Sequence, residues 1–329
     1  LTPQSGKNLR VVLEDDSQML GEVQVVAYGA QKKVSITGAI SSMKGEDLLK
    51  TPAASMSNVL SGQITGISSV QYSGEPGADE ADLYVRGIAT WNNAKPLIQV
   101  DGVEREFSQI DPNEVESITV LKDAGSAAIY GTRGANGVIL VTTKRGSGEA
   151  GKTVVTYDSY IAFNVAKPSP DILSADEFRR SRRGTDYGAD TDWYGLITRD
   201  VAYDTNQYIS IDGSTKNGFY GASFNYKSAN GLDIVSGREE FGGRFSMEQR
   251  VLENRLQFNG SLSARRVNET WGNDGFFDRA LTMNPTMPVY NADGSYYQPT
   301  SPTGATNPVA ELALRDNNGQ RMYLLGTAE

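Results

Sequence analysis

The strongest constraint on the fold is a two-residue alternation of apolar and polar side chains through residues 153–265. In one segment, for example, Tyr220 and Phe224 alternate with Ser223 and Asn225. A period of two places successive side chains on opposite faces of a β-strand. The C-terminal half is therefore predicted to form antiparallel strands with one apolar, aromatic face and one polar, charged face.

The connections between these segments are of two kinds. Short polar turns are expected at 216–218 and 253–254, and long polar loops at 167–204 and 269–320. Short turns at one end and long loops at the other are typical of an outer-membrane β-barrel. A soluble β-sandwich also alternates, although its connections are usually shorter, so this region leaves both folds open. No ligand contact is assigned to the loop aromatics, which suit either stacking on a substrate or packing against a neighbouring protein: Trp193, Trp271, Phe276, Phe277, Tyr290, Tyr296 and Tyr297.

Residues 114–146 predict a different unit, with the order strand, short helix, glycine-rich turn and strand. Val115 and Ile118 lie in the first apolar run, and residues 138–143 form the second. Asp123 between them is a residue type that caps helix N-termini. Both runs are apolar at nearly every position, which predicts that they are buried inside an α+β domain.

The turn in this unit contains three glycines with the spacing G-x-x-G-x-x-G, at positions 131, 134 and 137. A nucleotide-binding loop would instead show G-x-G-x-x-G, or a glycine followed by Lys and Ser or Thr. We interpret the glycines as turn residues that surround a buried or paired Arg133.

Four segments, taken together and in this order, resemble the plug domain of TonB-dependent outer-membrane transporters of the SusC/RagA type. They are VQVVAYG at 23–29, LYVRGIAT at 83–90, PLIQVDGV at 96–103 and the run at 114–146. The resemblance implies that the α+β unit is a plug domain and that the alternating strands that follow it belong to a transmembrane β-barrel.

The resemblance also predicts how the chain is divided. Residues 1–19 would end an N-terminal β-sandwich-like domain, 20–33 would hold the TonB box and a linker, 34–147 the plug, and 148–329 the first barrel strands and loops. About six strands are visible before a further one begins near residue 321, whereas about 22 are needed to enclose a plug. The barrel is therefore incomplete here, and we expect the chain to be part of a longer polypeptide.

The TonB box is placed by resemblance at Val23, Gln24, Val25, Val26, Ala27 and Tyr28. A short apolar strand between polar flanks can pair its open edge with a strand of another chain. By resemblance, that partner is the periplasmic energy transducer TonB. The alternative is an ordinary edge strand of the preceding sandwich.

Two arginines next to glycines, Arg86 and Arg133, suggest buried guanidinium groups, which need paired and hydrogen-bonded surroundings. Glu114, Glu116 or carboxylates on the inner barrel wall are the candidate partners. We hypothesise that such pairs hold the plug until it is pulled, and unchanged uptake in an Arg86→Ala, Arg133→Ala double variant would contradict this. A salt bridge local to the plug is the alternative.

Composition excludes several kinds of chemistry. The chain has no cysteine and no histidine, so it lacks a Ser-His-Asp triad, a thiolate metal site and any His-ligated metal or haem. A net charge of −9 argues against a nucleic-acid partner. Asp101, Glu104 and Glu106 form an acidic cluster that we interpret as a solvated turn, because no calcium-binding loop surrounds it. We expect no catalytic residue, cofactor or metal.

The resemblance implies active import across the cell outer membrane, in contact with its lipid. The substrate would be an oligosaccharide (glycan) or a peptide, captured beneath a SusD-like surface lipoprotein. One alternative is a secreted β-rich carbohydrate-binding or carbohydrate-acting protein, which fractionation would recover without detergent. Another is a signalling transducer of the same family, which sequence before Leu1 would reveal.

Overall fold

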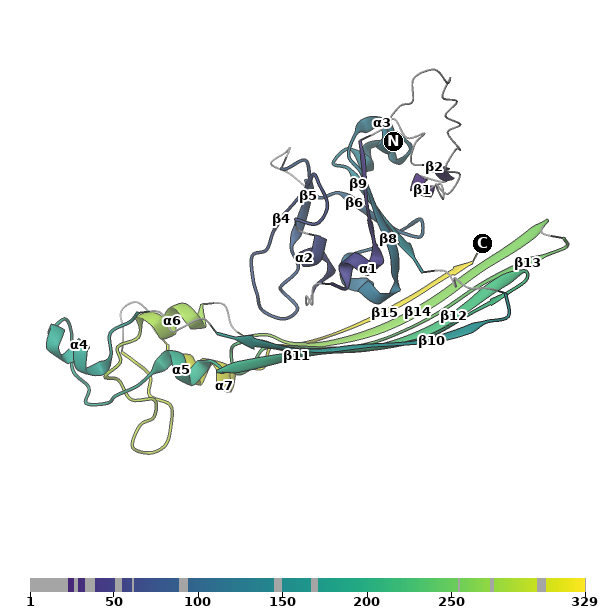
Figure 1. Ribbon diagram of the computed structural model, residues 1–329. Helices are drawn as coiled ribbons and strands as arrows, with labels where there is room; N and C mark the ends of the chain where they lie inside the picture. Colours follow the sequence, from purple (N-terminus) through teal and green to yellow (C-terminus); the bar gives the residue numbers. More distant parts are fainter. Residues whose placement is uncertain are drawn as a thin grey trace, which may run out of the picture.

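The computed structural model describes residues 39–50, 55–60, 62–88, 94–144, 150–166, 171–253, 255–272, 275–300 and 306–328, and the backbone of 23–26 and 29–32. Figure 1 shows an α+β domain beside one face of a long, curved sheet, with a group of helices at one end of that sheet. The predicted domain ends at 19, 33 and 147 lie outside the described residues, as do Ala27 and Tyr28 of the predicted TonB box.

The α+β domain is built on a five-stranded mixed sheet with the order β3-β8-β9-β6-β7. Its central strands are the two apolar runs of the sequence, which pair antiparallel and are buried along nearly their whole length. Strand β9 pairs in parallel with β6, whereas the other neighbours are antiparallel. The strands are β3 (Ile40–Lys44), β6 (Leu97–Val100), β7 (Val103–Glu104), β8 (Val115–Leu121) and β9 (Val138–Thr143).

Shorter elements cover this sheet and complete its core. Apolar side chains of the helices pack with those of the central strands in one cluster, which includes Leu48, Leu60 and Ile118. The elements are α1 (Gly45–Leu48), α2 (Met56–Leu60), a hairpin of β4 (Ile67–Val70) with β5 (Asp82–Val85), and the 3-10 helices η2 (Phe107–Gln109) and η3 (Pro112–Glu114).

The predicted helix between the two central strands consists of α3 (Ala124–Ala127) and the 3-10 segment η4 (Ala128–Gly134). Asp123 caps α3, because its side chain accepts a hydrogen bond from the backbone N of Ser126 at 2.7 Å. Gly137 has φ +91°, and a Cβ there would lie 2.8 Å from the Cβ of Val85. The turn therefore needs glycine both for its backbone and for close packing, in agreement with its prediction as a turn.

Among the described residues, the C-terminal half forms one antiparallel sheet of six strands in chain order. Five strands precede the last one, where about six were predicted, and the last begins at Asn318 rather than near residue 321. All six strands are long, and the five pairings between them run through most of each strand. They are β10 (Thr153–Val165), β11 (Val201–Thr215), β12 (Gly218–Asn230), β13 (Gly237–Val251), β14 (Leu256–Thr270) and β15 (Asn318–Ala328).

The register of this sheet aligns side chains of the same kind across strands. One row of paired residues crosses all six strands on the outer face, away from the α+β domain, and its large side chains are exposed: Val155, Ile211, Ala222, Phe245, Leu262 and Gly326. The adjacent row on the opposite face, which we call the inner face, contains Ser210, Ser223, Arg244 and Ser263. The predicted alternation is thus carried through the sheet.

The two long connections differ from their prediction as polar loops. They contain α4 (Ala175–Ser181), α5 (Trp193–Ile197), α6 (Phe276–Thr282) and α7 (Pro308–Leu314). Trp193 and Phe276 are buried in a small core between α5, α6 and α7, and we call these three helices the helical cap. Helices of five to seven residues are too short to show a clear helical period, so the sequence did not reveal them. No helix among the described residues has the length and apolar character to cross a bilayer.

Candidate functional site

The α+β domain contacts the inner face of the sheet through Arg244 of β13. Its Nη2 donates to Thr143 Oγ1 at 2.7 Å and to Asp101 Oδ2 at 3.3 Å, while Nη1 lies 3.9 Å from Glu114 Oε2. The Arg244 side chain is only 11% exposed. A guanidinium group with several rigid donors suits this position between two carboxylates. Arg244 therefore joins the sheet to three residues of the α+β domain.

Glu114 is held by two neighbouring residues of the sheet. Ser223 pairs with Arg244 in the register of β12 and β13, and its Oγ donates to Glu114 Oε1 at 2.9 Å. The opposite side of the contact is equally fixed. Asp101 lies in the β6–β7 turn and accepts hydrogen bonds from Thr143 N and Oγ1 at 3.0 and 2.6 Å. The contact is therefore ordered on both sides.

Burial dominates the electrostatics of the carboxylates at this contact. It raises the pKa of Glu114, and the attraction of Arg265 and Arg244 only partly offsets the effect. Burial likewise raises the pKa of Asp111, which caps η3 by accepting from Asn113 N at 2.8 Å. It also lowers the pKa of Arg105, further helped by repulsion from Arg244 and Arg265. The α+β domain thus presents both carboxyl groups and an arginine to an inner face that carries arginines of its own.

These shifts predict a pH dependence. Asp111 and Glu114 hold a proton more tightly in the folded domain than in the unfolded chain, where values near 3.8 and 4.5 apply. Their contribution to stability is then greatest below those values and is lost as the pH rises through the raised folded values. As the pH is raised from 4 to 8, the urea midpoint of the Asp111→Asn, Glu114→Gln variant should fall less than that of the wild type. Parallel profiles for the two proteins would contradict this.

Further charged side chains continue along the inner face of the sheet. Glu240 pairs with Arg265 and, at 3.1 Å, with Arg238. Glu269 pairs with Arg321 and lies 3.8 Å from Arg238. Buried charges are stable only when they are paired in this way. The inner face is therefore a polar wall rather than the interior of a sandwich.

A second contact joins the α+β domain to the end of the sheet near the helical cap. Glu75 Oε1 accepts a hydrogen bond from Gly272 N at 2.6 Å. Gly77 packs so closely on Glu269 that a Cβ there would lie 2.8 Å from Oε1. Glu75 and Gly77 both belong to the connection between β4 and β5. The domain is thus attached at two separated places.

The predicted ion-pair residues are placed differently from expectation. Arg133 is not buried: its side chain is 68% exposed and pairs with Glu104 at 3.0 Å, a salt bridge local to the domain. Arg86 and Glu116 are also exposed within this chain. Of the four candidates, only Glu114 contacts the sheet. The expected charges are also reversed, because here the domain supplies carboxylates and the sheet supplies an arginine.

Sequence reasoning missed Arg244 and Asp101 as partners. Alternation places Arg244 on the polar face of its strand, but no spacing rule connects residue 244 with residue 101. Asp101 was interpreted as part of a solvated acidic turn. Among the described residues, no group of three or more acidic side chains is arranged to hold a metal ion. The only sequence signal at Asp101 was the D-G turn at residues 101–102. Such a turn predicts the hairpin but not the residue that Asp101 contacts.

The predicted TonB box is described over its first four residues. Strand β1 (Val23–Val26) pairs antiparallel with β2 (Gly29–Lys32). Within the part of the chain that the structure describes, this is a separate two-stranded sheet, so β1 has one edge without a strand partner. An edge of this kind can accept a strand from another protein.

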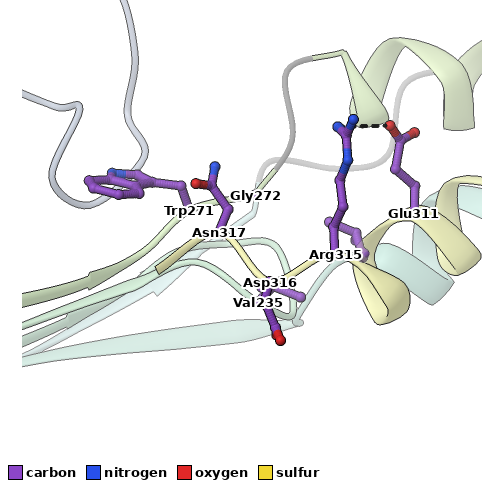
Figure 2. Close-up of a pocket in the computed structure, with 8 residues that line it drawn as sticks. Val235, Trp271, Gly272, Glu311, Arg315, Asp316 and Asn317 are labelled. Carbon is purple, nitrogen blue, oxygen red and sulfur yellow. Dashed lines mark ion pairs between the residues drawn. The ribbon is translucent and has the colours of Figure 1, made fainter. Parts of the chain in front are cut away.

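A hollow of about 260 Å³ lies between the end of the six-stranded sheet and the helical cap. Figure 2 shows Trp271 and Asn317 at the ends of β14 and β15, and the Glu311–Arg315 pair at the C-terminal end of α7. The Trp271 ring points away from that pair. Gly272, which binds Glu75, also lines the hollow. This hollow is thus adjacent to the second contact between domain and wall.

Comparison with known proteins agrees with this architecture. The family described as TonB-dependent Receptor Plug Domain matches residues 32–138. The TonB-dependent receptor SusC of Bacteroides thetaiotaomicron is 34% identical over 95% of this chain and 34% of its own length. The TonB-dependent receptor P26 of Formosa agariphila is 32% identical over 99% of this chain and 35% of its own length. The chain thus spans about a third of the length of these relatives.

Solved structures show the same fold. The RagAB peptide transporter aligns with a TM-score of 0.74 at 22% identity, over 89% of this chain and 39% of that one. The RagAB peptide importer in its open-open state aligns with a TM-score of 0.73 at 24% identity, over 88% and 38%. These likenesses support a plug domain followed by barrel strands.

A plug domain docked on the polar face of a sheet with an apolar outer face defines part of a TonB-dependent receptor. Within that class, the chain belongs to the SusC/RagA type. Relatives of this family are outer-membrane receptors and not enzymes. The α+β domain is therefore called the plug below, and the six-stranded sheet is called the wall.

Proposed function

We propose that the protein containing this chain imports a nutrient across the outer membrane, with the plug closing a lipid-embedded barrel. The substrate is an oligosaccharide or a peptide too large for ordinary porins. One observation supports this most directly: the plug binds the polar face of the wall, and the opposite face carries an exposed apolar row. Such a wall suits lipid outside and a closed channel inside.

The proposal includes two protein partners. TonB pairs with the strand at Val23–Val26 and pulls on it, using the proton gradient of the inner membrane. A SusD-like surface lipoprotein captures the substrate above the barrel. Support comes from the unpartnered edge of β1 within the described residues and from membership of the SusC/RagA type. RagAB is described as a peptide importer. The proposal for this protein therefore includes a peptide as well as a glycan substrate.

Growth and fractionation together test this function. A strain lacking the full-length gene should lose growth on a particular glycan or peptide mixture, and deletion of TonB should cause the same loss. The protein should appear in the detergent-soluble outer-membrane fraction. Recovery as a soluble extracellular product would contradict the proposal and favour a secreted carbohydrate-acting protein. Uptake that continues without TonB would contradict the energy source.

The apolar row makes its own prediction. Phe245 lies near the middle of β13 and is 47% exposed on the outer face. An arginine on the lipid face near the bilayer midplane costs about 2–4 kcal/mol. Phe245→Arg should therefore fold poorly into lipid vesicles, measured by the gel mobility of the folded barrel, whereas Phe245→Leu should fold normally. Equal folding of both variants would show that this face does not meet lipid.

A further inference from the structure

The outer face of the wall carries almost no charge. The register of the six strands assigns every second residue to this face, together with the exposed apolar row. Among the described strand residues, only two of these positions hold an acidic or basic side chain, Glu239 of β13 and Arg266 of β14. The other charged side chains of the six strands lie on the inner face. These two residues therefore need an explanation of their own.

Glu239 lies at one end of the apolar band on β13. The outer positions between it and Gln249 are apolar or glycine, and Phe245 and Met247 are exposed. Residues 239–249 span about 34 Å at about 3.4 Å per residue. In strands tilted by roughly 40°, that length covers about 25 Å along the membrane normal, the height of the apolar band of an outer-membrane barrel. Glu239 thus lies at a boundary between lipid and water.

Arg266 lies at the same boundary on the next strand. The outer positions of β14 from Leu256 to Ala264 are apolar or glycine, and Arg266 is the first charged residue after them. β14 ends at Thr270, where the long connection to β15 begins. Because the longer connections of outer-membrane barrels are extracellular, this boundary belongs to the outer leaflet.

Neighbouring amides hold one side of the Arg266 guanidinium. Its Nε donates to Asn268 Oδ1 at 3.3 Å, and Gln320 Nε2 on β15 donates to the same oxygen at 2.9 Å. The side chain is exposed, and neither Nη nitrogen contacts a carboxylate or another acceptor within the described part of the chain. Glu239, although diagonal to Arg266 in the register, does not pair with it. The Nη groups are therefore available to an anion from outside the chain.

We propose that Arg266, with the amide of Asn268, binds the phosphate of a lipid headgroup in the outer leaflet. A guanidinium presents two parallel N–H donors that match a phosphate, and the attraction is stronger at the edge of lipid than in bulk water. The residues that pair with Arg266 in the register, Phe241 and Met322, are exposed and apolar, and they suit the acyl chains of the same lipid. This site exists only if the wall stands in the outer membrane, as the proposed function requires.

The position of Arg266 argues against an imported solute as the ligand. Arg266 lies on the face opposite to that of Arg244, which contacts the plug, so a molecule bound at Arg266 is outside the channel. A soluble anion would have to approach a guanidinium that is bordered by lipid. A lipid phosphate is held at this depth by its own acyl chains.

Native mass spectrometry of the full-length protein in detergent tests this site. The probes are diphosphoryl lipid A, the same lipid with both phosphates removed, and inorganic phosphate. The wild type should bind diphosphoryl lipid A, and Arg266→Gln should weaken that binding about tenfold, because a charge-assisted hydrogen bond is lost. Arg266→Lys keeps the charge without the fork of donors and should weaken it less. The dephosphorylated lipid should bind equally to the wild type and Arg266→Gln.

Two further variants separate a phosphate site from a general effect of charge or folding. Asn268→Asp places a carboxylate beside the guanidinium and should weaken the binding of diphosphoryl lipid A as Arg266→Gln does. Glu239→Gln removes the other charge of the outer face and should bind this lipid at least as tightly as the wild type.

The lipid site is overturned if Arg266→Gln or Asn268→Asp binds diphosphoryl lipid A as tightly as the wild type, or if either loses the dephosphorylated lipid equally. A loss in Glu239→Gln as large as that in Arg266→Gln also overturns it. Displacement of the lipid by excess inorganic phosphate would show a site for a free ion only. None of these outcomes contradicts the importer function, which fails instead if the protein is recovered as a soluble extracellular product.

Discussion

Replacing Arg244 by alanine should release the plug from the wall. The substitution leaves Asp101 and Glu114 partly buried without the guanidinium that lies between them. Removing one partner of a buried ion pair typically costs about 3–5 kcal/mol, because the remaining charge is not compensated. We expect faster hydrogen exchange through β8 and β9 and easier proteolysis of the plug in the full-length protein. The pKa of Glu114, already raised by burial, should rise further.

A matched variant on the same strand provides the control. Arg250 pairs with Glu248 at 2.9 Å, but its side chain is 49% exposed. Exposed pairs contribute about 0–1 kcal/mol, so Arg250→Ala should leave plug exchange unchanged. Arg244→Lys keeps the charge and loses the fork of donors, and an intermediate effect is expected. If Arg244→Ala exchanges as slowly as the wild type, this contact does not hold the plug.

Val25→Pro should abolish energised uptake while leaving substrate binding intact. In the proposed function, TonB adds a strand to β1, and this pairing depends on backbone N–H groups. Proline has no N–H and is poorly accommodated within a paired strand. Uptake should then fall to the level of a strain without TonB, measured with labelled substrate in intact cells.

Two observations make this second experiment specific. Val25→Ala keeps the backbone donor and should retain most of the uptake. Binding measured on the purified protein should be the same for all three proteins, since β1 and β2 form a sheet separate from the wall. Normal uptake by Val25→Pro would show that the strand at Val23–Val26 is an ordinary edge strand and that TonB binds elsewhere.

Much of the fold was predictable because it depends on local patterns. The alternation of Tyr220 with Ser223 and their neighbours gave the faces of the wall, and the apolar runs around Ile118 gave the centre of the plug sheet. Asp123 and the turn glycines gave the helix between those strands. Each of these signals lies within about 15 residues of sequence. The short helices of the cap were missed, because none is long enough to show a period.

The contact between plug and wall could not be predicted in the same way. Arg244 meets Asp101 across 143 positions of sequence, and nothing in either segment specifies the other. Adjacent glycines drew attention to Arg86 and Arg133, which the structure places on the surface of this chain. A charge in a sequence shows which face is polar. Only the folded arrangement shows which opposite charge it meets.

β3 is an edge strand of the plug sheet, and this position determines the order in which the strands of the plug would unfold under a pulling force. β3 pairs only with β8 among the described strands, from Ile40↔Leu121 to Lys44↔Ser117. Tension applied upstream of residue 39 reaches this strand first and can open its ladder one rung at a time. The β8–β9–β6 ladder would survive that peeling. A channel could then open by partial unravelling and reseal by re-pairing, with no need to refold a whole domain.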